Sequence, residues 1–247
     1  MAEKNLTPEL PNLVTILAEQ FHGTPFAAFL VRWEKVIFSL IIVAGIIAFA
    51  CAASRRKSLI PGKLQSAGEV IVSGFDDFVC GIIGHEGRRF TPFIGTLFIY
   101  ILAMNLSGLI PFMKSSTSSW STTLALALCV FGYLQYTALK ELGFFGYIYH
   151  LMERPKGILA FSVVIPIMLL FLHIVSELIR PISLSLRLRS NIWGDDMLLT
   201  VLYGFGLGAL PLLLFNIVLA ILAAVVQAGV FCLLTTIYFT LVLSHED

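Results

Sequence analysis

One uncharged run of 48 residues, 197–244, constrains the fold of this chain more than any other feature. Four further uncharged runs precede it, at residues 36–53, 90–113, 124–139 and 157–176. About 20 consecutive apolar residues span the hydrocarbon core of a bilayer. Only 13% of the residues are charged, against about 25% in a soluble domain. The sequence therefore predicts an all-α, polytopic membrane protein with about five transmembrane helices.

Basic residues between the runs set the expected orientation. The first and second runs are joined by a connection that holds Arg55, Arg56, Lys57, Lys63, Arg88 and Arg89, and the third and fourth by one that holds Lys140, Arg154 and Lys156. The connection between the second and third runs holds only Lys114. Basic connections stay in the cytoplasm, so we expect the N-terminus outside and the C-terminus inside. Residues 1–35 then form an external or amphipathic segment, and residues 36–247 form one membrane domain.

Two further elements follow from composition. Residues 62–84 mix apolar residues with charges, which predicts an amphipathic helix on the cytoplasmic side of the membrane. The glycines and proline of residues 204–211 predict a turn, so the last two helices form a hairpin. Residues 212–244 would be roughly 50 Å long as a helix, and the helix before the turn is longer still. Because the hydrocarbon core is about 30 Å thick, the hairpin must tilt strongly or break.

The segment 176–196 is the exception to this apolar pattern. Its six charged residues are Glu177, Arg180, Arg187, Arg189, Asp195 and Asp196. A charge at the centre of a bilayer costs about 2.5–3.5 kcal/mol on insertion scales, so these side chains must face protein or water. A solvated loop, helped by Pro181, is one interpretation of the segment.

A continuous helix is the other interpretation. Steps of three or four residues then place one polar stripe along it, made of His173, Glu177, Arg180, Leu184, Arg187, Asn191 and Asp195. Arg189 lies off this stripe, about 200° from Arg187. Arg187 precedes the predicted turn by as many residues as Gln227 follows it. An antiparallel hairpin would therefore place the two side chains at the same depth in the membrane. Gln227 would either hold or hydrate Arg187, or make a plain hydrogen bond between helices.

The predicted topology orders the stripe across the membrane. His173 and Glu177 lie towards the cytoplasm, Arg187 in the middle, and Asn191, Asp195 and Asp196 towards the outside. Arginine does not deprotonate in proteins, so Arg187 would keep the two titratable clusters apart. That arrangement suits two half-channels rather than one pore. The alternatives are that Arg187 forms a structural ion pair with Asp195 or Glu177, and that one aspartate only caps a helix.

Several function classes are disfavoured. A net charge of +1 gives no indication of a nucleic-acid partner, and the chain has no phosphate-binding loop for a nucleotide. The four cysteines lack metal-ligand spacing, so we expect no metal and no cofactor. A secondary ion transporter with an intramembrane charge relay is the alternative function, but it would predict inverted repeats, which the sequence does not show. A purely structural anchor would not need the polar stripe.

The motifs of the chain resemble a known family, subunit a of the F-type ATP synthase. "RPISLSLRLRSNIWGDD" followed by "QAGVFCLLTTIYFTLVLSHED" carries the resemblance, and "PGKLQSAGEVIV", "LFIYILAMNLSGLIP" and "STTLALAL" extend it over about residues 34 to 244. The resemblance implies a non-catalytic channel subunit of the bacterial inner membrane. Its expected partners are the ring of c subunits, b-type stator subunits and membrane lipid, and ATP chemistry belongs to other subunits.

The resemblance also implies roles for individual residues. Arg187 matches the arginine that faces the ring carboxylate. Asn191, Asp196 and Gln227 match positions of the outer half-channel, and His173 and Ser183 match positions near the inner one. Arg180 matches a basic position before the proline.

Three positions depart from the family pattern. Arg189 is a second cation where members commonly read R-L-F-G-N. Many members carry a carboxylate at the position of His173, which Glu177, one turn on, would supply here. Many also carry a titratable group near Ala220, and its absence makes Asp195 and Asp196 the expected outer relay. Proton and sodium specificity are both open, because the neighbours of the ring carboxylate lie on another chain.

Overall fold

The computed structural model describes residues 25–54, 62–110, 117, 119–151 and 161–243. Its α-helices are α2 (Pro25–Ser54), α3 (Lys63–Ile83), α4 (Thr91–Ser107), α5 (Trp120–Leu151), α6 (Phe161–Gly204) and α7 (Leu210–Leu243). The short 3-10 helices η1 (His85–Arg89) and η3 (Gly206–Ala209) lie between them. Every regular element within the described ranges is helical, which confirms the all-α prediction.

Four of these helices are long and apolar enough to cross a membrane. The apolar windows are Val36–Ala53, Trp120–Glu141, Met168–Leu202 and Leu210–Leu241. Helix α4 is apolar but shorter, at 17 residues. The polytopic membrane architecture is confirmed among the described residues, whereas the count of five spans stays a prediction that depends on α4. Helix α2 begins at Pro25, within the predicted N-terminal segment, and residues 1–24 lie outside the described ranges.

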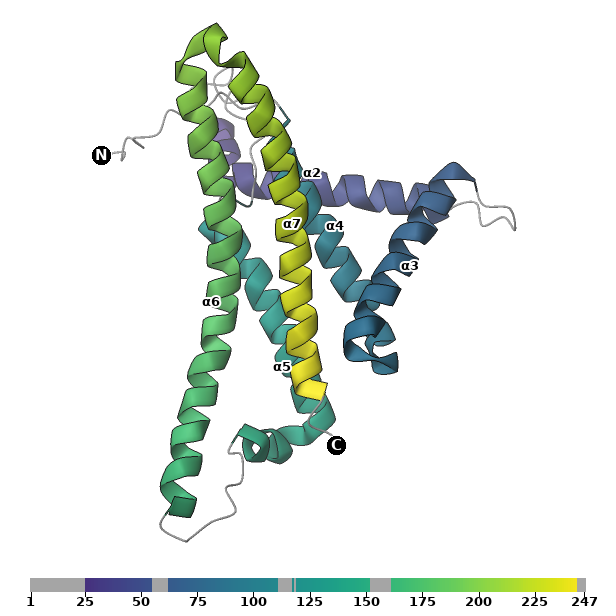
Figure 1. The fold of residues 1–247 in the computed structure, drawn as a ribbon, viewed down its shortest axis with the longest axis vertical. Helices are drawn as coiled ribbons and strands as arrows, with labels where there is room; N and C mark the ends of the chain where they lie inside the picture. Colours follow the sequence, from purple (N-terminus) through teal and green to yellow (C-terminus); the bar gives the residue numbers. More distant parts are fainter. Residues whose placement is uncertain (1–24, 55–61, 111–116, 118, 152–160, 244–247) are drawn as a thin grey trace.

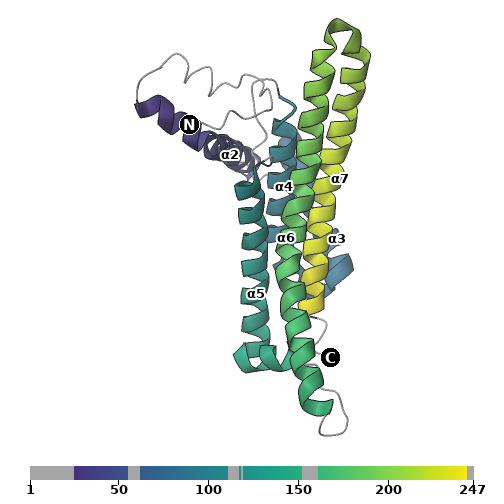
Figure 2. The same ribbon diagram turned by 90° about the vertical axis from the view of Figure 1, so that its left-hand side faces the viewer.

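Helices α6 and α7 lie side by side and antiparallel, joined by the turn at η3 (Figures 1 and 2). Gly206 has φ 65° in this turn, a left-handed conformation that glycine adopts without steric cost. The predicted hairpin is therefore confirmed. Helix α6 is continuous through Pro181 and through all six charged residues of the 176–196 segment, so the interpretation of that segment as a loop is wrong.

The reason for this continuity is packing. Pro181, Leu184, Ser185 and Leu188 are all buried and recur at helical spacing, so tertiary contacts hold the segment helical across the proline. A proline inside a helix removes one backbone hydrogen bond, and neighbouring helices tolerate that loss in membrane proteins.

Helices α4 and α5 pack against one side of the hairpin (Figure 2). Helix α2 instead runs across the long axis of the hairpin (Figures 1 and 2) and reaches α4 through a hydrogen bond of 2.8 Å between the hydroxyls of Ser39 and Tyr100. Helix α5 bends at Gly143, which has φ 67°. The hairpin thus forms the edge of the molecule, with one face covered by α4 and α5.

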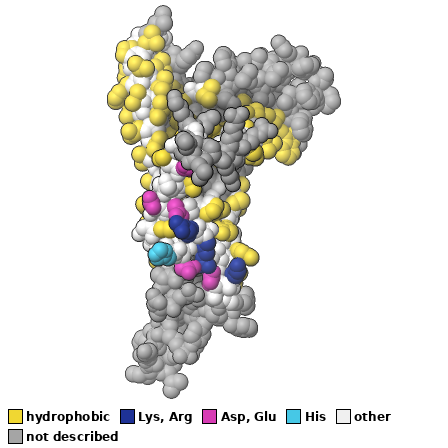
Figure 3. All heavy atoms as spheres, turned by 90° about the vertical axis from the view of Figure 1, so that its right-hand side faces the viewer, with side chains coloured by type: hydrophobic (Ala, Val, Ile, Leu, Met, Phe, Trp, Pro, Cys, Tyr) yellow, Lys and Arg dark blue, Asp and Glu magenta, His cyan; other side chains and the backbone are white. Residues whose placement is uncertain are grey.

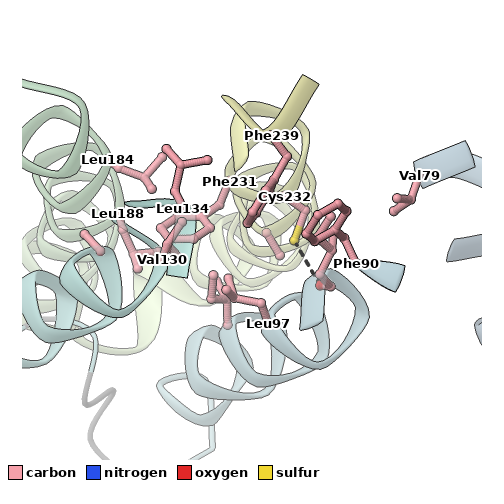
Figure 4. Packing of buried hydrophobic residues seen from close by; sticks show 14 residues of the cluster. Val79, Phe90, Leu97, Val130, Leu134, Leu184, Leu188, Phe231, Cys232 and Phe239 are labelled. Carbon is pink, nitrogen blue, oxygen red and sulfur yellow. Dashed lines mark hydrogen bonds between the residues drawn. The ribbon is translucent and has the colours of Figure 1, made fainter. Parts of the chain in front are cut away.

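The hydrophobic core lies where α4, α5, α6 and α7 meet (Figure 4). Phe90 stacks on Phe239 with ring centroids 4.6 Å apart, and Tyr133 meets the same ring edge-on. The thiol of Cys232 donates to the carbonyl of Ile94 at 3.6 Å, which joins α7 to α4. Small residues let membrane helices approach closely, and α7 turns the buried Ala220, Ala224 and Ala228 inward.

A polar network closes the end of the bundle where α3, η1 and α5 meet. The Arg88 guanidinium donates to the Asp76 carboxylate at 3.0 and 3.1 Å, and Arg89 donates to Glu141 on α5 at 2.6 Å. Charged side chains gather in one band on the face that α3 presents (Figure 3). The helix predicted over 62–84 is confirmed as α3, although its placement on a membrane surface stays a prediction. Arg88, Arg89 and Lys140, from the two basic connections, lie at this same end.

Candidate functional site

Arg187 projects from a face of α6 that no other described helix covers. Leu184, Leu188 and Ile192 form the packed face of α6, and the helical repeat turns Arg187 about 100° away from Leu188. Its side chain is exposed, and no ion pair between described residues involves it. The exposed Ser183, Ser190 and Gly194 share its face of the helix, and the exposed apolar side chains Ile182, Leu186 and Trp193 lie on the adjoining side of α6. The uncovered face therefore carries a permanent cation beside an apolar surface, and such a charge requires a partner or water inside a membrane.

Arg189 faces a different neighbour. Its guanidinium carbon lies 5.2 Å from the centre of the Trp120 ring at the start of α5, a cation–π contact. The side chain is half-buried and its Nε is buried with no hydrogen-bond partner. The prediction that Arg189 points away from the face of Arg187 is confirmed.

A small open crevice lies between α4, α6 and α7, beyond Arg187 in the direction of η3. It is lined by Asn105, Gly108, Leu109, Ile192, Asp195, Asp196, Leu199, Ala220 and Ala224. The predicted outer carboxylates, Asp195 and Asp196, are both partly buried in it. The alanines of α7 leave room beside them for about one or two water molecules. The crevice can therefore bring water to the two carboxylates.

Two buried amides near this end were not predicted as site residues. The Asn105 carbonyl oxygen accepts from the Thr117 hydroxyl at 3.1 Å, while its amide nitrogen is buried with no partner among the described residues. The amide nitrogen of Asn216, on the buried face of α7, has no partner there either. An amide within an apolar run is the signal that could have found both, because a polar group is costly in a membrane without a partner.

The register of α6 against α7 is set by contacts on both sides of Arg187. The Arg180 guanidinium carbon lies 4.9 Å from the centre of the Tyr238 ring, and Asp195 and Ala220 line one crevice. These contacts bracket Arg187 on α6 and Gln227 on α7, which places the two residues at similar depth. Gln227 is buried, with 8% of its surface exposed.

The residues predicted for the inner side of the site are more dispersed. The Glu177 carboxylate accepts a hydrogen bond of 2.8 Å from the Gln135 amide on α5. His173 is half-buried, and its Nδ1 lies 3.1 Å from the carbonyl oxygen of Leu169 in its own helix. Ser183 is exposed. Gln135 was not predicted, although it too is an amide in an apolar run.

The residues of the polar stripe on α6 do not all face the same neighbours. Glu177 contacts α5, Arg180 contacts α7, and Arg187 lies on the uncovered face. Asn191, half-buried, lies between Arg187 and the crevice along the helix. Because α5 and α7 pack on either side of α6, stripe residues three or four positions apart reach different helices.

Comparisons with known proteins agree with this arrangement. Residues 36–240 match the family model described as ATP synthase A chain. The chain is 38% identical to ATP synthase subunit a of Protochlamydia amoebophila, over 98% of this chain and 92% of that relative. It is 36% identical to ATP synthase subunit a of Moorella thermoacetica, over 89% and 93% of the two chains. A Geobacter relative of the same name is 34% identical over 86% of this chain and 88% of its own length.

Similarity of this extent spans the helices that carry the exposed arginine, the crevice and the hairpin. The chain therefore belongs to the ATP synthase A chain family, the membrane subunits a of F-type ATP synthases.

Proposed function

We propose that this chain is the stator channel subunit, which conducts protons through two offset half-channels to and from the carboxylates of a rotating c-ring. Proton flow would thereby drive ring rotation and ATP synthesis. The chain itself would be non-catalytic and bind no nucleotide, no nucleic acid and no cofactor. Its partners would be the c-ring, b-type stator subunits and lipid in a bacterial inner membrane.

The single observation that carries this proposal is the exposure of Arg187 on the uncovered face of the hairpin, beside its exposed apolar side chains. An opposite charge within about 4–6 Å favours the ionised form of a carboxylate. A ring carboxylate arriving opposite Arg187 would therefore lose its proton to one half-channel. Since Arg187 does not deprotonate, it would also stop protons from passing directly between the half-channels.

The other site residues take their places on either side of Arg187. On the outer side, Asp196, Asp195, Asn191, Gln227 and the unpredicted Asn105 would form a hydrated route through the crevice. The route depends on water, which the buried amides and carboxylates can hydrogen-bond.

On the inner side, Glu177 would be the relay carboxylate, with His173 and Ser183 beside the route. This assignment is supported by the position of Glu177 one turn from His173 along α6, at the end of the helix pair opposite to the crevice.

The dimensions of the helices support a strongly tilted hairpin. At 1.5 Å per residue, the 44 residues of α6 extend about 66 Å, roughly twice the hydrocarbon thickness. Helix α2 crosses the hairpin axis (Figure 1), so both cannot stand upright in one bilayer. A tilted hairpin would lay its uncovered face along the side of a ring.

The test is the Arg187→Gln variant of the whole complex in inverted membrane vesicles. Proton pumping driven by ATP is followed with a pH-sensitive dye, and assembly is checked by blotting. We expect pumping to be abolished in an assembled complex, and Arg187→Lys to fail as a substitute because lysine can release its proton when buried. An assembled Arg187→Gln complex that still pumps would refute the proposal, and loss of assembly would instead indicate a structural ion pair.

A further inference from the structure

The hydrogen bond between Gln135 and Glu177 joins α5 to α6 at the inner side of the site. The Gln135 Nε2 donates to the Glu177 Oε2 at 2.8 Å, and both side chains are half-buried. Gln135 stands at the edge of the packed face of α5, between the buried Leu134 and Thr137. The contact therefore ties a carboxylate of the polar stripe to a second helix.

The pair lies near a contact between α6 and α7. Arg180, three residues after Glu177, lies over the Tyr238 ring of α7. The pair is thus next to the place where α5, α6 and α7 approach one another. A glutamate side chain has several rotatable bonds, and a donor on another helix restricts the positions of its carboxylate. Charge-assisted hydrogen bonds of this kind are among the stronger ones in proteins.

We propose that Gln135 is a positioning residue that holds the Glu177 carboxylate in place for proton transfer in the inner half-channel. The inference rests on the proposed function, since it requires a proton route through Glu177. The carboxylate takes up a proton from water on the cytoplasmic side and releases it towards the ring, returning to its starting charge. Gln135 transfers no proton itself and only fixes where that exchange takes place.

The chain offers a matched control for this contact. Gln65 donates to Glu69 at 2.8 Å in the same amide-to-carboxylate geometry, but within α3 and on an exposed surface. Gln135→Met keeps the length of the side chain and removes the donor, and Gln65→Met does the same on α3. Both variants are made in the whole complex and assayed in inverted vesicles, with assembly measured by blotting.

We expect Gln135→Met to slow ATP-driven pumping by about tenfold, the factor that one hydrogen bond to a charged group typically supplies. Gln65→Met should pump like the parent complex. Normal pumping by an assembled Gln135→Met complex would overturn the inference. Loss of pumping in proportion to lost assembly would overturn it as well, since Gln135 would then only hold the helices together.

A double-mutant cycle separates positioning from a structural role. If Gln135 acts only through Glu177, Gln135→Met adds no further loss to Glu177→Gln. If Gln135→Met slows pumping by the same factor in the Glu177→Gln variant as in the parent complex, the inference is contradicted. The exchanged pair, Gln135→Glu with Glu177→Gln, restores one carboxylate and one amide, and should pump faster than Glu177→Gln alone. Failure of the exchanged pair to exceed Glu177→Gln would contradict a joint role for the two side chains.

Arg187→Gln is the reference that separates this inference from the proposed function. If Arg187→Gln abolishes pumping and Gln135→Met does not slow it, only the role of Gln135 is refuted. If Arg187→Gln pumps normally, the half-channel mechanism itself fails.

Discussion

At the scale of single residues, the charges of α6 differ in what each of them faces. Arg187 is exposed on the uncovered face of α6, Arg189 lies over Trp120, and Asp195 and Asp196 line a crevice. The same helix therefore presents cations to two different surroundings. Their expected contributions to ion conduction differ for that reason.

Arg189→Gln should retain much of the proton pumping. The guanidinium packs on α5 rather than on the uncovered face, so its removal leaves the charge of Arg187 in place. We expect at most a small loss of stability, about 0.5–1 kcal/mol for a cation–π contact. Pumping by Arg189→Gln vesicles is compared with that of Arg187→Gln vesicles at equal assembly. If both lose coupling, the distinction between the two arginines is wrong.

Asp196→Asn should slow ATP-driven pumping without loss of assembly. Asparagine keeps the shape and hydrogen-bonding capacity of the side chain but cannot carry the proton, and the crevice has no titratable group on α7 to replace it. Asp195→Asn and the double variant are measured in the same vesicles. Normal pumping by both single variants and the double variant would rule out a relay at these aspartates and leave them as structural groups.

At the scale of elements, the junction of α3, η1 and α4 depends on one carboxylate. Asp76 on α3 accepts from Arg88 on η1 and from the Thr91 hydroxyl at 3.0 Å on α4. The Arg88 guanidinium, aided by Thr91, lowers the pKa of the Asp76 carboxyl below its usual 3.8. The same contact raises the pKa of Arg88. The junction is therefore held by a charge that remains ionised in mild acid.

This junction should open only in strong acid. The pKa of Asp76 is lower in the folded protein than in the unfolded chain, where it is about 3.8. The ionised carboxylate therefore stabilises the fold fully above about pH 3.8, and this stabilisation is lost as the pH falls through the pKa of the folded protein. Hydrogen exchange of α3 amides in the purified complex measures this opening. Asp76→Asn should lower protection at neutral pH and remove most of the acid-dependent change.

Asp77→Asn is the control for that measurement, because Asp77 is exposed and adjacent in sequence. It should leave the protection of α3 unchanged. Equal loss of protection in the two variants would mean that the contacts of Asp76 do not hold the junction.

At the scale of the whole molecule, polar contacts are divided between two ends. The network of Arg88, Arg89 and Glu141 closes one end, whereas Asn105, Thr117 and the crevice lie at the other. The start of α5 therefore lies at the end that holds the crevice, and the part of α5 that carries Glu141 lies at the end that holds the network. The proposed topology places the first end in the cytoplasm and the second outside.

Cysteine labelling tests that orientation on one helix. Ser121 is exposed near the start of α5, and Lys140 is exposed just before the bend at Gly143. Each is replaced by cysteine in a chain whose four native cysteines are alanine. A membrane-impermeant maleimide should label Lys140→Cys only in inverted vesicles, because the basic end faces the cytoplasm. It should label Ser121→Cys only in right-side-out vesicles. Labelling of both from one side would contradict a membrane-spanning α5, and the reverse pattern would invert the topology.

Much of this protein followed from the sequence alone. Long uncharged runs predicted the membrane helices, since few other structures can satisfy the backbone in a bilayer. The glycines and proline near residue 206 predicted the hairpin, and helical spacing predicted that Arg187 and Arg189 face apart. Each of these depends on local periodicity or local backbone conformation, which neighbouring residues specify. The motif around Arg187 also indicated the family.

The tertiary structure decided which side chains from distant segments meet. Gln135 is 42 residues from Glu177, yet it donates to that carboxylate. Asn105 joins the crevice of Asp195 only because α4 packs against the hairpin. The continuity of α6 through Pro181 also required the packing of its neighbours. Such contacts depend on how helices cross and on the size of the residues between them, and periodicity within one helix contains neither.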